Sequence, residues 1–275
     1  MLIQGQCIYT FESNPHIFMI TKTLKLKWII AFVCMIAIGL AAFAQNLSAY
    51  QRPVDLKISH LTGDYYVYET FDIFNGVRVS ANSMYIVTSE GVVLIDTPWQ
   101  ENQVQPLLDS IANRHHKKVV LCLVTHSHDD KTAGLDALRK QGVKTYSSKK
   151  TLDLCRKNKE KEAEFYFTND TTFTVGNHTF QTYYPGEGHA PDNIVVWCAE
   201  AKVLYGGCLV KSTENNSLGN IADANLKEWP LSIKKVMKKY PDPQYVVPGH
   251  LSWTNNQGLQ HTLDLLQDHT KLKAQ

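Results

Sequence analysis

The chain has 275 residues, of which 44% are hydrophobic and 20% are charged, and its formal net charge is +2. This composition is typical of a globular protein and excludes an intrinsically disordered chain. The net charge is too small to indicate nucleic acid as a partner, so we expect no nucleic-acid binding.

The first 44 residues have the pattern of a secretory signal peptide. Lys22, Lys25 and Lys27 precede an apolar block, Trp28–Ala44, that ends in small residues before Gln45. The block is short for a membrane span, and an uncleaved anchor is the alternative interpretation. We therefore expect export to the periplasm and no stable membrane association after cleavage.

Cleavage leaves residues 45–275, which we expect to form a single, monomeric domain; Met19 is an alternative translation start within the removed part. The remaining chain carries 25 basic and 25 acidic residues, so no charge-driven partner is indicated. Its cysteines do not have the spacing of a small disulfide scaffold, and a domain of about 230 residues has core enough without disulfides. These cysteines are Cys122, Cys155, Cys198 and Cys208.

Hydrophobic alternation predicts four strands at the start of this domain, with hairpin-type turns at Asn75-Gly76 and Glu90-Gly91. A helix follows over Glu101–His115, because apolar residues from Val104 to Ile111 share one face. The chain then alternates between strand and helix. The predicted strands are Asp64–Phe71, Gly76–Val79, Ser83–Thr88, Val92–Thr97, Val119–Val124 and Val143–Ser147, and the later helices are Leu135–Lys140 and one from Lys149.

A second β-rich portion completes the domain. Its predicted strands are Thr172–Val175, His178–Pro185, Asn193–Cys198, Lys202–Gly207 and Gln244–Gly249, and its helices are Glu228–Tyr240 and Gln257–Lys271. This order predicts an α/β fold in which two β-sheets pack together with helices outside, in one domain of two similar halves.

Residues that can bind a metal follow several of these strands. His126, His128 and Asp130 come after Val119–Val124, and the spacing of the two histidines points both imidazoles to one side. His189, Cys208 and His250 also follow strand ends, where functional loops are commonly placed. Imidazole, carboxylate and thiolate are ligands that zinc accepts. Each position alone is compatible with an ordinary polar turn, but their recurrence favours a metal site.

The other histidines of the domain have no such context, and we expect them at the surface or in helices. They are His60, His115, His116, His178, His261 and His269.

Together, His126-x-His128-x-Asp130, His189, Cys208 and His250 resemble the zinc-binding pattern of class B β-lactamases, subclass B1, in the metallo-β-lactamase superfamily. The resemblance covers essentially all of residues 45–275. Further matching segments are Leu94–Trp99, Gly219–Ala224 and Trp229–Val236.

Three positions separate the chain from other branches of that superfamily. Lys131 stands where glyoxalase-type enzymes and another β-lactamase subclass have histidine, and Cys208 stands where the glyoxalase-type enzymes have aspartate. His126 stands where mono-zinc carbapenemases have asparagine, which indicates a two-zinc site. Ser127 and Leu251 depart from the family pattern, where an aromatic residue and glycine are common, and leave the shape of the pocket open.

The resemblance implies an αβ/βα four-layer sandwich with two Zn²⁺ at the edge between the sheets. The first zinc would be held by three histidines, and the second by the carboxylate, the thiolate and the last histidine. It implies hydrolysis of the β-lactam amide bond of penicillins, cephalosporins and carbapenems by a zinc-bound hydroxide without a covalent intermediate, conferring antibiotic resistance. The sets are His126, His128 and His189, and Asp130, Cys208 and His250.

Other roles follow from the same resemblance. Asp130 would orient the hydroxide, Lys211 would bind the substrate carboxylate, and Asn220 would lie near the substrate carbonyl. Lys211 could instead be a solvated surface lysine, and Asn220 a turn former. The hairpin Phe71–Val79 would cover the site, with Ile73, Phe74 and Val77 in apolar contact with substrate, unless these side chains face the core.

Two alternative functions stay open. One is a hydrolase of the same superfamily that acts on a thioester or lactone. The other is a non-catalytic zinc protein, although structural zinc sites are usually closed four-coordinate cages and this ligand set leaves positions open.

Overall fold

The structure is a computed structural model that describes residues 34–36, 55–74 and 76–273. Its contacts divide the chain into Met1–Pro53 and Val54–Gln275, and only the second unit is treated below. Apart from residues 34–36, the predicted signal peptide and Met19 lie outside the described residues. Within the described ranges no helix is both long and apolar enough to cross a bilayer.

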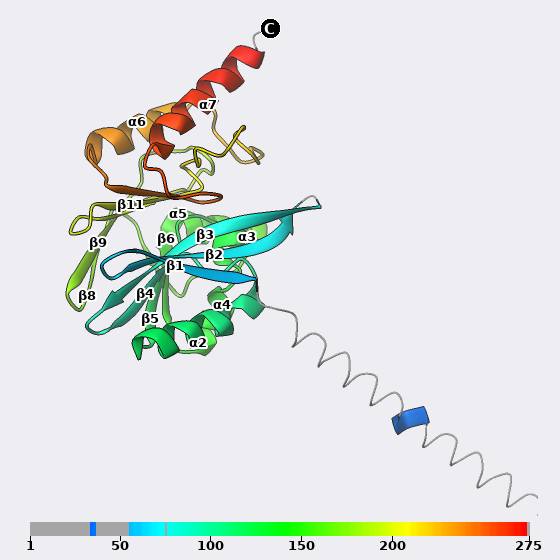
Figure 1. The fold of residues 1–275 in the computed structure, drawn as a ribbon. Coiled ribbons are helices and arrows are strands. Elements are labelled where there is room, and N and C mark those ends of the chain that lie inside the picture. The colour runs from blue at the N-terminus through cyan, green and yellow to red at the C-terminus, as the bar shows by residue number, and fades with distance from the viewer. Residues whose placement is uncertain (1–33, 37–54, 75, 274–275) are drawn as a thin grey trace, which may run out of the picture. The chain divides into compact units, whose positions relative to one another are not determined.

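The unit Val54–Gln275 contains two β-sheets (Figure 1). The larger sheet follows chain order: β1 (Leu56–Thr62), β2 (Tyr65–Phe74), β3 (Val77–Thr88), β4 (Gly91–Ile95), β5 (Val119–Leu123), β6 (Lys144–Ser148) and β7 (Phe165–Phe167). The smaller sheet has the order β12 (Tyr245–Pro248), β11 (Val203–Gly207), β10 (Val195–Cys198), β9 (His178–Tyr183) and β8 (Thr172–Val175).

Helices cover the outer faces of both sheets (Figure 1). The helices α2 and α4 lie against the larger sheet, and α6 and α7 lie on the smaller one. Their bounds, with those of the remaining helical elements, are η1 (Glu101–Gln103), α2 (Val104–His115), α3 (Asp129–Thr132), α4 (Leu135–Lys140), α5 (Lys149–Asn158), α6 (Trp229–Lys239) and α7 (Gly258–Lys273).

The central strands are buried on both faces because side chains alternate along a strand. In β4, Val93 faces the core between the sheets, whereas Leu94 packs under α2 and α4. In β11, Tyr205 faces the same central core and Leu204 packs under α6 and α7. Burial on two faces explains why these strands are almost continuously apolar in the sequence.

The predicted architecture of two packed sheets with outer helices is confirmed, with changes in the elements. Gly76–Val79 and Ser83–Thr88 form one strand, β3, because the three residues between them continue the ladder with β2. One of these, Asn82, is buried and donates from Nδ2 to the carbonyls of Pro248 and Leu251, which a polar turn would not do. The elements β1, β7 and α3 are absent from the prediction. The last two have three and four residues, too few to show a hydrophobic period.

His178 corrects a second expectation, because it is buried rather than at the surface. It begins β9, where the β1–β2 and β10–β11 turns converge on it. Its Nε2 lies 2.9 Å from a carboxylate oxygen of Asp64, and its Nδ1 lies 2.9 Å from one of Glu200. Each ring nitrogen therefore has its own polar partner, so the burial leaves no ring nitrogen unpaired.

The two sheets are joined by a buried polar contact at Asp96, directly after β4. Its carboxylate accepts hydrogen bonds from the Thr125 backbone N–H at 2.7 Å, the Thr125 hydroxyl at 2.9 Å and the Tyr205 hydroxyl at 2.6 Å. The Tyr205 oxygen also lies 2.7 Å from the Asn82 carbonyl. Burial raises the pKa of Asp96 to about 6, although nearby Lys131 and these donors oppose the rise. This contact fixes the start of the loop after β5.

Tyr205→Phe should remove one of the donors to a buried carboxylate. We expect the free energy of unfolding to fall by about 2 kcal/mol, measured by urea unfolding of the metal-free protein. The matched control is Tyr240→Phe, because that hydroxyl is buried and has no partner among the described residues. Because this change removes no hydrogen bond, it should not lower the free energy of unfolding. Equal losses in the two variants would contradict the role of the Asp96 contact.

Candidate metal centre

The predicted ligands meet because the strands before them run in the same direction. In the smaller sheet β9 and β11 are both antiparallel to β10, and β11 is parallel to β12, so all three end at one edge. Cys208 and His250 come close together because Gly207 pairs with Pro248. A Cβ on the intervening Gly249 would lie 2.5 Å from the Cys208 sulfur, so only glycine fits there.

The loop after β5 brings three further ligands from the larger sheet. Asp96 binds Thr125 and thereby sets the backbone position of His126. His128 is the extended N-cap residue of the short helix α3, with φ −75° and ψ 152°. Asp130 lies in the first turn of that helix. The change from extended to helical backbone turns these side chains toward the smaller sheet.

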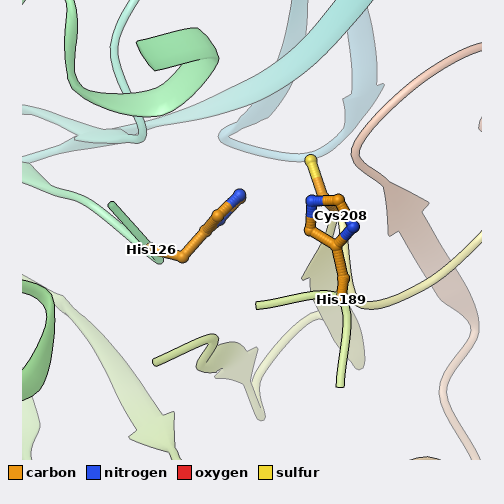
Figure 2. A group of neighbouring side chains, drawn as sticks. All are labelled: His126, His189 and Cys208. Carbon is orange, nitrogen blue, oxygen red and sulfur yellow. The ribbon is translucent and has the colours of Figure 1, made fainter. Parts of the chain in front are cut away.

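Three imidazoles form one side of the cluster. The ring centroids of His126, His128 and His189 are 4.8 to 5.3 Å apart, and the rings are tilted by 76° to 88°. His128 Nδ1 and His189 Nε2 lie 3.2 Å apart. In Figure 2 the His126 ring points toward the His189 ring, and the sulfur of Cys208 lies above the His189 ring.

Asp130, Cys208 and His250 form the other side. The Cys208 sulfur lies 3.4 Å from Asp130 Oδ2 and 3.3 Å from His250 Nε2, and these last two atoms are 3.5 Å apart. His250 Nδ1 donates to the Ser80 carbonyl at 2.5 Å, which leaves Nε2 free to bind a metal.

The spacing of these atoms fits zinc. Tetrahedral coordination with Zn–N and Zn–S bonds of about 2.0–2.3 Å separates ligand atoms by roughly 3.3–3.6 Å. The contacts above are of that size. His126 Nε2 is also buried with no hydrogen-bond partner among the described residues, as expected for an atom that binds a metal ion.

All six predicted ligands belong to one continuous cluster. Ligand atoms lie within 4.8 Å of one another in three overlapping groups: His126, His189 and Cys208; His126, His128 and Asp130; and Asp130, Cys208 and His250. The third group is the predicted second set. His126 is shared by the other two groups, so distances alone do not divide the six into two triplets.

The protonation states also suit a cation. Burial lowers the pKa of His126 and His189 well below the usual value and that of His250 to about 4, so these imidazoles are neutral at pH 7. Burial opposes ionisation of Asp130, but Lys131 and the nearby histidines outweigh it and hold its pKa well below the usual value. Burial and the adjacent carboxylate of Asp130 raise the pKa of Cys208. A cation is what converts this thiol to thiolate.

Lys131 is adjacent to the ligand Asp130 and is fully buried. Its ammonium donates to the Asn82 carbonyl at 3.0 Å and lies 3.2 Å from Asp130 Oδ2. Burial opposes its charge, but Cys208 and Asp130 more than compensate and raise its pKa. Lys131 has no predicted role in the site, although its place directly after a ligand was the available signal.

The structure places the predicted polar substrate residues, Lys211 and Asn220, in different environments. Lys211 is 6% exposed, which excludes a solvated surface lysine, and its ammonium lies 5.4 Å from the centre of the Trp229 ring. Burial lowers the pKa of Lys211, while Cys208 and Asp130 oppose the shift. Asn220 is exposed, and its Oδ1 accepts from the Ala222 N–H at 3.1 Å, so it does form a turn.

The tip of the β2–β3 hairpin carries the predicted apolar contacts. Ile73, Phe74 and Val77 are 62%, 44% and 63% exposed. They do not face the core, and apolar side chains displayed at a hairpin tip are available to a ligand.

Comparisons with known proteins agree with this geometry. A family model described as the metallo-beta-lactamase superfamily matches residues 76–256. A metallo-beta-lactamase type 2 from Elizabethkingia meningoseptica is 42% identical over 246 residues, 89% of this chain and 96% of that protein. Metallo-beta-lactamase IND-1 from Chryseobacterium indologenes is 41% identical over 73% of this chain and 84% of its own length.

Solved structures lead to the same family. The crystal structure of metallo-beta-lactamase IND-7 matches with a TM-score of 0.76 and 39% identity, over 78% of this chain and all of that one. A metallo-beta-lactamase from Pontibacter korlensis matches with a TM-score of 0.75 and 38% identity, over 78% of this chain and 99% of that one. The fold, the ligand cluster and these similarities together show that the chain belongs to the metallo-beta-lactamase superfamily.

Proposed function

We propose that this protein hydrolyses the amide bond of β-lactams with two zinc ions. The observation that carries the proposal is the approach of the Asp130 carboxylate, the Cys208 thiol and the His250 imidazole to within 3.5 Å of one another, next to three further histidines. Its relatives are named metallo-beta-lactamases at up to 42% identity, which supports the substrate class. Penicillins, cephalosporins and carbapenems are the proposed substrates, and resistance to them the consequence.

The proposed ligand sets are those that the sequence predicts. His126, His128 and His189 hold one zinc, and Asp130, Cys208 and His250 hold the other. When bound, zinc supplies a Lewis acid and a water molecule whose pKa is lowered to about 7. His250 contacts the Ser80 carbonyl, Asp130 contacts Lys131, and Asp96 holds the backbone of Thr125 next to His126. These contacts orient the ligands before any metal arrives.

The other proposed steps are carried out by side chains of the protein and not by the metal. Asp130 accepts a hydrogen bond from the attacking water and so orients it toward the carbonyl. Lys211 donates to the carboxylate that β-lactams carry beside the ring nitrogen. The Asn220 amide binds near the carbonyl oxygen, and Phe74, with its neighbours at the hairpin tip, covers the substrate and excludes water.

Export is part of the proposal. Residues 1–44 would direct the chain to the periplasm, be removed after Ala44 and leave a soluble monomer. N-terminal sequencing of the exported protein tests the cleavage site, and a mature N-terminus other than Gln45 would contradict it.

Metal removal should separate this mechanism from a serine mechanism. Dialysis against a strong chelator should abolish nitrocefin and meropenem hydrolysis, and added zinc should restore it, because the proposed nucleophile is a zinc-bound water and not a serine hydroxyl. Inhibitors that acylate serine should have little effect. Zinc-loaded protein that cleaves a thioester or lactone but no β-lactam would instead favour the alternative hydrolase.

Cys208→Ser should weaken the second zinc site, because a serine hydroxyl is not ionised as a thiolate ligand is. Metal analysis should give about one zinc per chain instead of two. Mutating a residue that only hydrogen-bonds to a metal ligand typically costs roughly 10–100-fold in activity, and kcat/KM for nitrocefin should fall by more than that. Cys198→Ser is the matched control, since this buried thiol belongs to the core between the sheets. Full activity and two zincs in the Cys208 variant would refute its assignment.

Lys211→Ala should impair substrate binding without removing metal. A charge-assisted hydrogen bond contributes about 1.5–3 kcal/mol, so KM for β-lactams should rise roughly 10–100-fold. Zinc content should stay at the wild-type value. Lys234→Ala on the exposed face of α6 provides the control and should leave KM unchanged. An unchanged KM in the Lys211 variant would place the anchoring cation elsewhere.

A further inference from the structure

The loop between β11 and α6 touches the metal centre through Asp223. Its Oδ2 lies 3.0 Å from His128 Nε2. The Asp223 side chain is 54% exposed, whereas that of His128 is 21% exposed. An aspartate that reaches from a solvent-facing loop to a buried cluster forms a direct link between the two.

The same loop has a second attachment two residues later. The Asn225 backbone N–H donates to the Gly188 carbonyl at 2.8 Å, and its Nδ2 donates to Glu187 Oε2 at 2.8 Å. Gly188 directly precedes His189. The loop is therefore hydrogen-bonded both to the backbone next to His189 and to the side chain of His128.

The Asp223 contact determines which nitrogen of His128 carries the proton. A carboxylate is an acceptor only, so Nε2 must be the N–H donor, and in a neutral imidazole Nδ1 then has the free lone pair. Nδ1 is also the atom that lies 3.2 Å from His189 Nε2. The nitrogen that faces the other ligands is thus the one left able to bind a metal.

Asn220 belongs to the same turn. It lies three residues before Asp223, and its Oδ1 accepts from Ala222 N–H, the residue next to Asp223. A constraint on Asp223 is therefore also a constraint on the residue proposed to meet the substrate carbonyl.

We propose that Asp223 is a positioning residue with two effects. It fixes the tautomer and orientation of His128, and it ties the loop Gly219–Asn225, with Asn220, to the metal ligands. Metal binding by the three histidines then holds this loop in place, and a loosened loop weakens metal binding, since coupling between two sites is reciprocal. The inference rests on the proposed function for the role of Asn220, but its tests do not require turnover.

The test compares Asp223→Ala with Asp223→Asn in the full domain. Zinc affinity is measured by competition with a chromophoric chelator, and hydrogen exchange reports opening of Gly219–Asn225. We expect Asp223→Ala to weaken the first zinc about 10-fold and to speed exchange of the loop amides. Asp223→Asn keeps an acceptor oxygen and should stay within about 3-fold of wild type. Asp242→Ala, which removes an exposed carboxylate paired with Lys202, should change neither.

Nitrogen NMR of the histidine rings reports which nitrogen of His128 carries the proton. A residue that only stabilised the loop would not change this. In the metal-free wild type, the His128 proton should be on Nε2, and Asp223→Ala should redistribute it between the two nitrogens. A wild-type proton on Nδ1 would overturn the proposal even if the alanine variant failed to fold. So would wild-type zinc affinity and loop exchange in Asp223→Ala.

These outcomes are separate from those of the proposed function. Zinc-loaded wild type that hydrolyses nitrocefin while Asp223→Ala keeps full zinc affinity would refute the positioning role alone. Loss of affinity in the variant, with no β-lactam hydrolysis by wild type, would refute the function and leave the positioning role intact.

Discussion

The site depends on the burial of Asp130 and Cys208 at 3.4 Å from each other. Two groups that bind metals as anions cannot both ionise at that distance in a low-dielectric interior without a cation between them. The Lys131 ammonium compensates the negative charge of Asp130, and the Cys208 sulfur stays protonated until a metal binds. Metal binding is therefore coupled to release of the thiol proton, and the fold supplies an arrangement that only a cation completes.

That arrangement is rigid because both sheets contribute to its support. Asp96 holds the loop after β5 and is itself held by Tyr205 from the other sheet. Asn82 of β3 receives the Lys131 ammonium on its carbonyl and donates to the chain on either side of His250. Buried polar groups that are satisfied in this way specify one geometry, whereas an apolar core would tolerate several.

The sequence predicts the metal ligands better than it predicts the residues that hold those ligands in place. His126, His128 and Asp130 are recognisable because they are close in the chain and follow an apolar strand, and His189 and Cys208 because they too follow strands. Local sequence patterns could not predict hydrogen-bond partners that are far apart in the chain. Asp223 meets His128 across 95 residues, and the partners of the buried His178 lie 114 and 22 residues away. Strand periodicity shows that a face is buried but not which distant side chain lies opposite.

Each proposed zinc draws ligands from both halves of the molecule. The first joins two residues after β5 to one after β9, and the second joins α3 to the ends of β11 and β12. A bound ion would thus act as a cross-link between the sheets, and its binding energy would add to resistance against unfolding by mass action. Where zinc is scarce, the lifetime of such a protein would depend on metal supply as well as on its apolar interior, since chains deprived of the ion would open more often and reach proteases sooner.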